Sequence, residues 1–360
     1  MTQKISALLY AGVTSLLLSG LLGIVPRANA QTQIQVYGAW HCYTDGCSWA
    51  SVPNMTTFDT DNRWLIDRDM NGTYSPSVNL VILSFVDPVK LMNKTTDSGD
   101  TNGIPIGMNT AVISYFQSRG VRVMFSIGGA SYRKNWDKAL GSNPTQLGIN
   151  AANAAKQFNV GMEIDYENSS TPNTSGLQQF VSAYRSQIPY DSTGANYPAR
   201  LTIDLGDGDT YLTKLDSYAV TNWLQTSAPV LDYANAMVAT QKTSVATLES
   251  GWQQHVDGDG TAVPPQAPAK LTGSLWLVGG QPNCDNFSNS DQNTAASFVE
   301  NLAPAGAGTT PGMLGYMFWA AGCQGNGTGC TFPPNTCQIG MGGAMTAFNI
   351  PVPMPALRQN

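Results

Sequence analysis

Residues 158–168 read FNVGMEIDYEN. Three carboxylates, Glu163, Asp165 and Glu167, occupy alternate positions in what is otherwise the pattern of a buried β-strand. Alternate side chains of a strand point to one face, so the three acids share one face and the apolar residues between them share the other. If the sheet closes into a barrel covered by helices, the apolar face packs against the helices and the three acids lie inside.

The crowding of these acids indicates chemistry, because only 12% of the residues in the chain are charged. Like charges a few ångströms apart in a poorly solvated place cannot all ionise, so at least one acid should hold a proton near neutral pH and be able to donate it. Glu167, the last in the row, would reach the mouth of the barrel, with Asp165 below it and Glu163 deeper. The alternative is a solvated edge strand with one polar face.

The chain around this segment alternates between short apolar, β-rich runs and segments of helical character, which is typical of βα units in a parallel sheet. The eight strand candidates suit a TIM-type (β/α)8 barrel, whose reactive groups lie at the C-terminal ends of its strands. The predicted strands are 34–39, 80–85, 121–127, 160–166, 201–205, 233–238, 274–278 and 314–319. The predicted helices are 109–119, 144–157, 175–186, 210–219, 244–255 and 291–302.

Residues 1–30 have the pattern of a secretory signal peptide. Lys4 is followed by an apolar run over 5–25 and by PRANA at 26–30, which are the basic, apolar and small-residue parts of such a signal. We therefore expect a secreted protein in which residues 31–360 form one (β/α)8 domain without a large insertion domain. An uncleaved membrane anchor is the alternative. No second run approaches the roughly 18 apolar residues of a membrane span, so we expect no membrane contact after cleavage.

The charge of the chain argues against some partners. The formal net charge is −6, and the sequence contains no run of Lys or Arg. Nucleic acid or an anionic membrane therefore has no electrostatic support as a partner, and a neutral substrate fits better.

Six cysteines lie in loop-like stretches and are expected to form disulfides in an exported protein. Cys42 and Cys47 are the preferred local pair. A zinc site that includes them and His41 is disfavoured, because the chain has only two histidines and no C-x-x-C pair, and we expect neither a metal nor a cofactor. The other four cysteines permit three pairings, which the sequence leaves open: Cys284, Cys323, Cys330 and Cys337.

Three motifs in chain order resemble glycoside hydrolase family 18, the chitinases and endo-β-N-acetylglucosaminidases. The family carries D-x-x-D-x-D-x-E at the end of its fourth barrel strand, and segment 160–167 matches it in the last two acids, Asp165 and Glu167. The family's S-x-G-G on the third strand is present at 126–129. Its eighth strand ends in an aromatic residue after a G-x-M-x-W-like run, as in GYMFWAAG at 315–322.

The resemblance implies a (β/α)8 barrel that hydrolyses β-1,4 links in polymers or glycans of N-acetylglucosamine with retention of configuration. Glu167 would protonate the leaving oxygen and later activate water. Asp165 would hold the substrate's own 2-acetamido group as that group attacks the anomeric carbon, and Glu163 would support Asp165 from below. We expect a monomer that acts on this polysaccharide or glycan.

The resemblance also implies a set of substrate contacts. Trp319 would form an apolar floor under the sugar ring. Trp49, Trp136 and Trp276 lie near predicted strand ends or loops, where they either line a groove or pack in the core. The further residues expected to bind substrate are Trp40, Met237, Tyr316, Gly128 and Gly129.

The chain departs from the family pattern in two places. Val160 and Glu163 stand where the family has aspartates, in the deep part of the site. On the sixth strand, Ala239 and Thr240 follow Met237 where the family has Tyr and then Asp or Asn. A donor to the developing charge is then missing, which can cost on the order of 3 kcal/mol of barrier. The candidate substitutes are Gln241, Tyr316 and Tyr211.

Two other functions therefore stay open. One is a catalytically weak or inactive chitin-binding lectin on the same barrel, and the other is an endo-β-N-acetylglucosaminidase that acts on N-glycans, since a fold alone does not define the substrate.

Aspartate-rich segments hint at calcium but are better explained by turns. They are IDLGDGDTY at 203–211, with Asp204, Asp207 and Asp209, and VDGDGT at 256–261. Asp204 lies inside the fifth strand candidate. As an alternative to a turn residue, its side chain could face the cleft.

Overall fold

The structure of the chain is a computed structural model that describes residues 36–43, 47–67, 71–74, 76, 78–206, 211–237, 244–276 and 312–322. All described residues fall in one compact unit. The predicted signal peptide at 1–30, the predicted helix at 291–302, Asp207, Asp209 and the cysteines after Cys47 lie outside the described residues.

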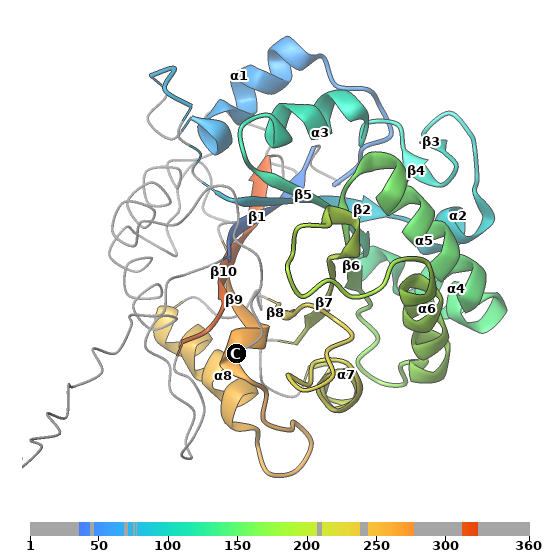
Figure 1. Cartoon of the computed structure of the whole chain (residues 1–360), viewed down its shortest axis with the longest axis vertical. Helices are drawn as coiled ribbons and strands as arrows, with labels where there is room; N and C mark the ends of the chain where they lie inside the picture. Colours follow the sequence, from blue (N-terminus) through green and yellow to red (C-terminus); the bar gives the residue numbers. More distant parts are fainter. Residues whose placement is uncertain are drawn as a thin grey trace, which may run out of the picture. The chain divides into compact units, whose positions relative to one another are not determined.

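Eight parallel strands close into a barrel, as predicted (Figure 1). The order around the barrel is β1-β10-β9-β8-β7-β6-β5-β2, so successive barrel strands are neighbours in the sheet. Each predicted strand overlaps an observed one, and the seventh begins at Leu271 instead of 274. The strands are β1 (Val36–Cys42), β2 (Leu80–Val86), β5 (Arg122–Gly128), β6 (Gly161–Asp165), β7 (Leu201–Leu205), β8 (Ala234–Ala236), β9 (Leu271–Trp276) and β10 (Gly315–Gly322).

Helices lie around the outside of the strands (Figure 1). Side-chain caps begin most of them; Asn109, for example, accepts hydrogen bonds from two backbone N–H groups at the start of α3. The sequence predicted α3, α5, α6, α7 and α8 and missed α1, α2 and α4. The helices are α1 (Met55–Ile66), α2 (Pro88–Asn93), α3 (Thr110–Gln117), α4 (Arg133–Ser142), α5 (Pro144–Phe158), α6 (Thr174–Gln187), α7 (Thr213–Asn222) and α8 (Val245–Asp257).

Shorter elements complete the described part of the chain. They are an antiparallel pair, β3 (Asp100–Thr101) and β4 (Ile104–Pro105), and the 3-10 helices η1 (Ala130–Tyr132), η2 (Tyr197–Ala199) and η3 (Pro268–Lys270). None of the helices in the ranges given above has the length and apolar character needed to cross a membrane.

Apolar side chains form two clusters, one on each face of the barrel sheet. The outer cluster, between sheet and helices, includes Met162, Ile164 and Tyr166. The apolar residues of the β6 segment therefore face the helices and its acids face the interior, as the alternation predicts. The inner cluster consists of Val36, Trp40, Leu80, Ile82, Met124, Tyr233, Leu314 and Met317. Strands β6 to β9 contribute buried polar side chains instead: Glu163, Asp165, Thr202, Asp204, Asn235, Thr272 and Ser274.

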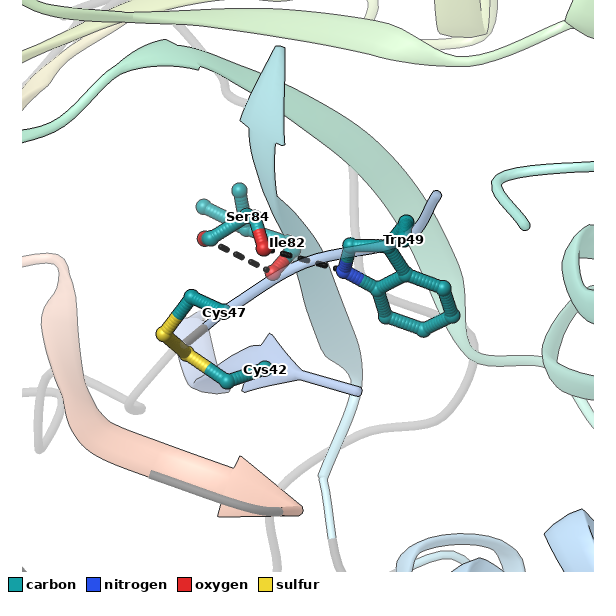
Figure 2. Close-up of a disulfide and its surroundings, with 5 residues drawn as sticks. All are labelled: Cys42, Cys47, Trp49, Ile82 and Ser84. Carbon is teal, nitrogen blue, oxygen red and sulfur yellow. Dashed lines mark hydrogen bonds between the residues drawn. A yellow bond between two sulfur atoms is a disulfide. The ribbon is translucent and has the colours of Figure 1, made fainter. Parts of the chain in front are cut away.

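A disulfide joins Cys42, at the end of β1, to Cys47 in the following loop, which confirms the predicted local pair (Figure 2). Figure 2 also shows Trp49, whose indole N–H donates to the backbone oxygen of Ser84 at 2.9 Å. The loop after β1 is thus tied both to its own strand and to β2.

Candidate active site

The acids of the β6 segment occupy the barrel interior. Glu163 and Asp165 are 0% and 4% exposed, and Glu167 follows the strand and is half-buried. Because all eight barrel strands are parallel, their C-terminal ends share one end of the barrel. Glu167 is the acid nearest to this end.

Two glycines at the end of β5 allow its backbone to lie against that of Asp165. At Gly128, whose φ is +123°, a Cβ would be 1.9 Å from the Asp165 carbonyl oxygen, so a side chain has no room. The N–H of Gly129 and the indole N–H of Trp136 donate to the same oxygen at 3.1 and 2.9 Å. A Cβ at Gly129 would be 2.9 Å from the ring of Phe85. The S-x-G-G motif therefore positions the acid strand, and contact of either glycine with substrate stays a prediction.

Two donors hold Glu163 in the interior. Trp40 Nε1 donates to its Oε1 at 2.9 Å, and Asn235 Nδ2 donates to its Oε2 at 2.7 Å. Thr272 Oγ1 in turn donates to Asn235 Oδ1 at 2.5 Å. Burial raises the pKa of Glu163 to about 7, against the opposing effect of the Trp40 and Asn235 hydrogen bonds. Trp40, a predicted sugar contact, is 3% exposed, and its indole N–H donates to Glu163.

A fourth acid, Asp204 on β7, belongs to the same cluster. It is 2% exposed. Burial raises its pKa well above the usual range, and the charges of Glu163 and Asp165 raise it further. Burial and the charges of Glu167 and Glu163 raise the pKa of Asp165 in the same way. Acids that interact this closely share protons, so the cluster retains protons at a pH where isolated carboxyl groups are ionised. Of the two positions considered for Asp204, the structure places it in the interior.

One oxygen of Asp165 has no donor among the described residues. Oδ1 is buried and makes no hydrogen bond with any described residue. A buried acceptor without a donor is unfavourable, so an N–H or O–H group brought to this position by a bound molecule gains a strong interaction.

Glu167 is paired with a tyrosine from the loop between β7 and α7. The O–H of Tyr211 donates to Glu167 Oε2 at 2.9 Å. Burial raises the pKa of Glu167, while the Tyr211 hydrogen bond and the charge of Arg133 oppose the rise. Tyr211 is 38% exposed, so the pair lies where a substrate can reach it.

Two aromatic residues, Trp319 on β10 and Phe85 on β2, stack at the C-terminal end of the barrel. Their ring centroids are 5.7 Å apart with 22° between the planes, and the Trp40 ring lies 6.3 Å from that of Trp319. The Ser84–Phe85 and Trp319–Ala320 peptide bonds are cis. Both residues are half-buried.

The other aromatic and apolar candidates have varied positions. Met237 follows β8 and packs against the outer cluster. Trp49 and Trp136 are 1% and 0% exposed within that cluster, so they pack in the core and do not line a groove. Only the backbones of Tyr316 and Trp276 are described, within β10 and β9, and positions 239–241 lie outside the described residues.

In the described ranges, no group of three or more His, Cys, Asp or Glu side chains is arranged to hold a metal ion. His41 Nε2 lies 2.6 Å from Asn62 Oδ1, and burial lowers the pKa of His41 to about 4. Cys42 and Cys47 are joined to each other.

Comparison with solved structures bears on the fold. The chain is similar to a chitinase from Rhizomucor miehei over 87% of this chain and 100% of that chain, with a TM-score of 0.53 and 13% sequence identity. It is similar to a GH18 chitinase from Pseudoalteromonas aurantia over 79% of this chain and 93% of that chain, with a TM-score of 0.51 and 13% identity. The chain has the fold of the family 18 chitinases. No family model and no curated protein matches the sequence, so the likeness is one of fold.

Within this chitinase fold, the motifs missed Asn235, which donates to Glu163, Thr272, which donates to Asn235, and Phe85, which stacks on Trp319. Asn235 pairs in register with Asp204 on one side and with Thr272 on the other. The available signal for polar side chains in the interior was alternation along a strand. In LTIDL, for example, Thr202 and Asp204 are two positions apart and therefore share one face. Nothing in LVILSFV distinguishes Phe85 from a core residue.

Proposed function

We propose that the protein is a secreted glycosidase that cleaves β-1,4 links in N-acetylglucosamine polymers such as chitin, with retention of configuration. The observation that carries the proposal is the pairing of a half-buried acid, Glu167, with a buried acid, Asp165, whose Oδ1 has no hydrogen bond with a described residue. The first side chain is positioned to donate a proton and the second to receive an N–H.

In this proposal Glu167 acts as acid and then as base. Its raised pKa favours the protonated form, and it donates that proton to the glycosidic oxygen as the bond to the anomeric carbon breaks. The leaving sugar departs with a hydroxyl group. The Glu167 carboxylate then takes a proton from the water that attacks the anomeric carbon, which restores the starting state.

The substrate's 2-acetamido group is the proposed nucleophile. Its carbonyl oxygen bonds to the anomeric carbon as the leaving group departs, and a positively charged oxazolinium ion forms. Asp165 Oδ1 accepts the acetamido N–H, and the ionised form of Asp165 offsets the positive charge. Glu163 and Asp204 are suited to hold the proton that Asp165 gives up, because burial raises the pKa of both.

Tyr211 is the proposed replacement for the donor missing from the sixth strand. Its hydroxyl lies 2.9 Å from Glu167 Oε2, next to the reacting centre. A phenol at this position can donate to the acetamido oxygen once substrate is bound, which stabilises the charge that develops there.

The stacked rings of Trp319 and Phe85 are the proposed floor of the sugar site. A pyranose has an apolar face, and the half-buried Trp319 ring offers a flat surface of matching character at the same end of the barrel as Glu167.

The protein is proposed to act outside the cell as a monomer, with residues 1–30 removed and 31–360 as one domain. The Cys42–Cys47 disulfide supports an oxidising compartment. The net charge of −6 is compatible with a neutral polysaccharide as substrate.

The test compares the mature chain with Glu167→Gln on N-acetylglucosamine oligomers and on a high-mannose glycopeptide. Glu249→Gln, on α8 outside the barrel, is the matched control. We expect the unchanged chain and the control to cut the oligomers, and Glu167→Gln to be slower by about 100-fold or more.

Other outcomes of this test separate the alternatives. Binding of oligomers without cleavage by the unchanged chain identifies a lectin. Cleavage of the glycopeptide alone identifies an endo-β-N-acetylglucosaminidase. Equal cleavage by the unchanged chain and Glu167→Gln removes Glu167 from the acid role.

A further inference from the structure

Three basic side chains gather at the N-terminal end of the barrel, opposite to Glu167. Arg122 is the first residue of β5, and Arg200 and Lys270 directly precede β7 and β9. In each case the next residue along the chain packs in the outer cluster, so the basic side chain belongs to the interior face. The three residues are 5%, 2% and 6% exposed. We call Arg122, Arg200 and Lys270 the basic cluster.

Most N–H groups of the two arginines lack an acceptor. Nε, Nη1 and Nη2 of Arg200 and Nε and Nη1 of Arg122 are buried and have no described acceptor in good hydrogen-bond geometry. The phenol groups of Tyr233 and Tyr197 interact with Arg200 and Arg122 in poorer geometry. Nη2 of Arg122 donates to the backbone oxygen of Gly194 at 2.5 Å. Buried charged donors without partners are strongly unfavourable, and proteins ordinarily supply a counter-charge or an acceptor for them.

Asp232, an acid beside the basic cluster, already has partners. Its Oδ2 accepts from Nη2 of Arg185 at 3.3 Å and from the N–H of Leu201 at 2.8 Å. Lys270 Nζ donates to the backbone oxygen of Asp232 at 2.9 Å and makes no ion pair with its carboxylate. The charge of Asp232 raises the pKa of Lys270, but no described carboxylate forms an ion pair with Arg122, Arg200 or Lys270.

The cations also repel one another. Burial and the charge of Arg200 lower the pKa of Arg122 to about 10, and burial lowers that of Lys270 to about 8. Tyrosine rings support the guanidinium groups: the central carbon of Arg122 lies 4.1 Å from the ring centroid of Tyr197, and that of Arg200 lies 5.8 Å from that of Tyr233. An anion between the two guanidinium groups would replace this repulsion with attraction.

We propose that the basic cluster binds a small oxyanion, a phosphate, sulfate or carboxylate, bridged between Arg122 and Arg200 with Lys270 adding charge. Guanidinium groups present several N–H donors in a fixed plane, which matches the oxygens of such an anion. Strand β6, between β5 and β7, has Gly161 beside Arg200, and the side chain of Met124 from β5 lies against this glycine. The site lies at the opposite end of the barrel from Glu167, and the proposal does not depend on glycosidase activity.

The test is thermal unfolding of the full chain with inorganic phosphate, sodium acetate or sodium chloride at equal ionic strength. We expect phosphate to raise Tm saturably, by about 2 °C or more, and chloride to have no such effect. A larger rise with acetate would identify a carboxylate as the preferred anion. No rise with phosphate or acetate beyond that with chloride would overturn the proposal.

Arg200→Met should abolish the rise. Arg119→Met is the matched control, because Arg119 also stacks on a tyrosine, Tyr74 at 3.6 Å, but is exposed. If Arg200→Met does not fold, crystals of the unchanged chain grown with selenate should show an anomalous peak between Arg122 and Arg200. The proposal is wrong if the rise persists in Arg200→Met, or if selenate binds only elsewhere.

Discussion

Replacement of Glu163 by glutamine tests the electrostatics of the acid cluster. Burial raises the pKa of Glu163 to about 7, from 4.5 for an exposed glutamate. The folded chain holds this proton more tightly than the unfolded chain, so the contribution of Glu163 to stability is fully present below pH 4.5 and is lost as the pH rises through 7. The difference between these pKa values corresponds to about 3 kcal/mol.

The assay is denaturant unfolding of the unchanged chain and of Glu163→Gln from about pH 4 to about pH 8. The free energy of unfolding should fall with rising pH in both proteins, since Asp165 and Asp204 act in the same direction. The fall should be smaller in Glu163→Gln by about 3 kcal/mol. In Glu249→Gln, a change at a half-buried residue outside the barrel, most of the pH-dependent fall in the free energy of unfolding should remain. An identical pH dependence in Glu163→Gln and the unchanged chain would refute the reasoning.

Three further predictions concern the surroundings of the acids. Gly128→Ala should destabilise the fold by more than about 4 kcal/mol in thermal or denaturant unfolding, because the position combines a positive φ with backbone contact, whereas Gly141→Ala should be tolerated, because no atom would lie within 4 Å of its Cβ. Tyr211→Phe removes a hydrogen bond that lowers the pKa of Glu167, so the alkaline limb of the rate profile should move to higher pH as kcat falls; an unchanged profile contradicts this. Cys42→Ser opens a loop closed over a separation of 5 residues and should cost about 2 kcal/mol in denaturant unfolding, and no change in midpoint would contradict that.

The strands were predictable because most carry a short apolar run. β9 was placed too late, because Leu271 is followed by the polar interior residue Thr272 and by Gly273, which packs against Trp252 of α8, so the strand does not begin with an apolar run. Helix α1 was missed for a related reason: its sequence MTTFDTDNRWLI is largely polar, and its clearest signal is the cap at Asn54, which accepts from two backbone N–H groups.

The site was predictable where it lies on one strand. Glu163 and Asp165 follow from spacing within β6. Asp204, Asn235 and Thr272 come from three other strands, and only barrel closure and strand register bring them to the β6 acids. Local spacing does not encode those contacts, which explains why the fourth acid was left undecided and the amide beside it was missed.

The most direct test of the central claim is proton NMR of the first sugar released from an N-acetylglucosamine tetramer. Hydrolysis by the mature chain should yield the β-anomer before mutarotation, and Glu167→Gln should release almost none. Initial release of the α-anomer, or release at the same rate by Glu167→Gln, would contradict a substrate-assisted reaction driven by the proton on Glu167.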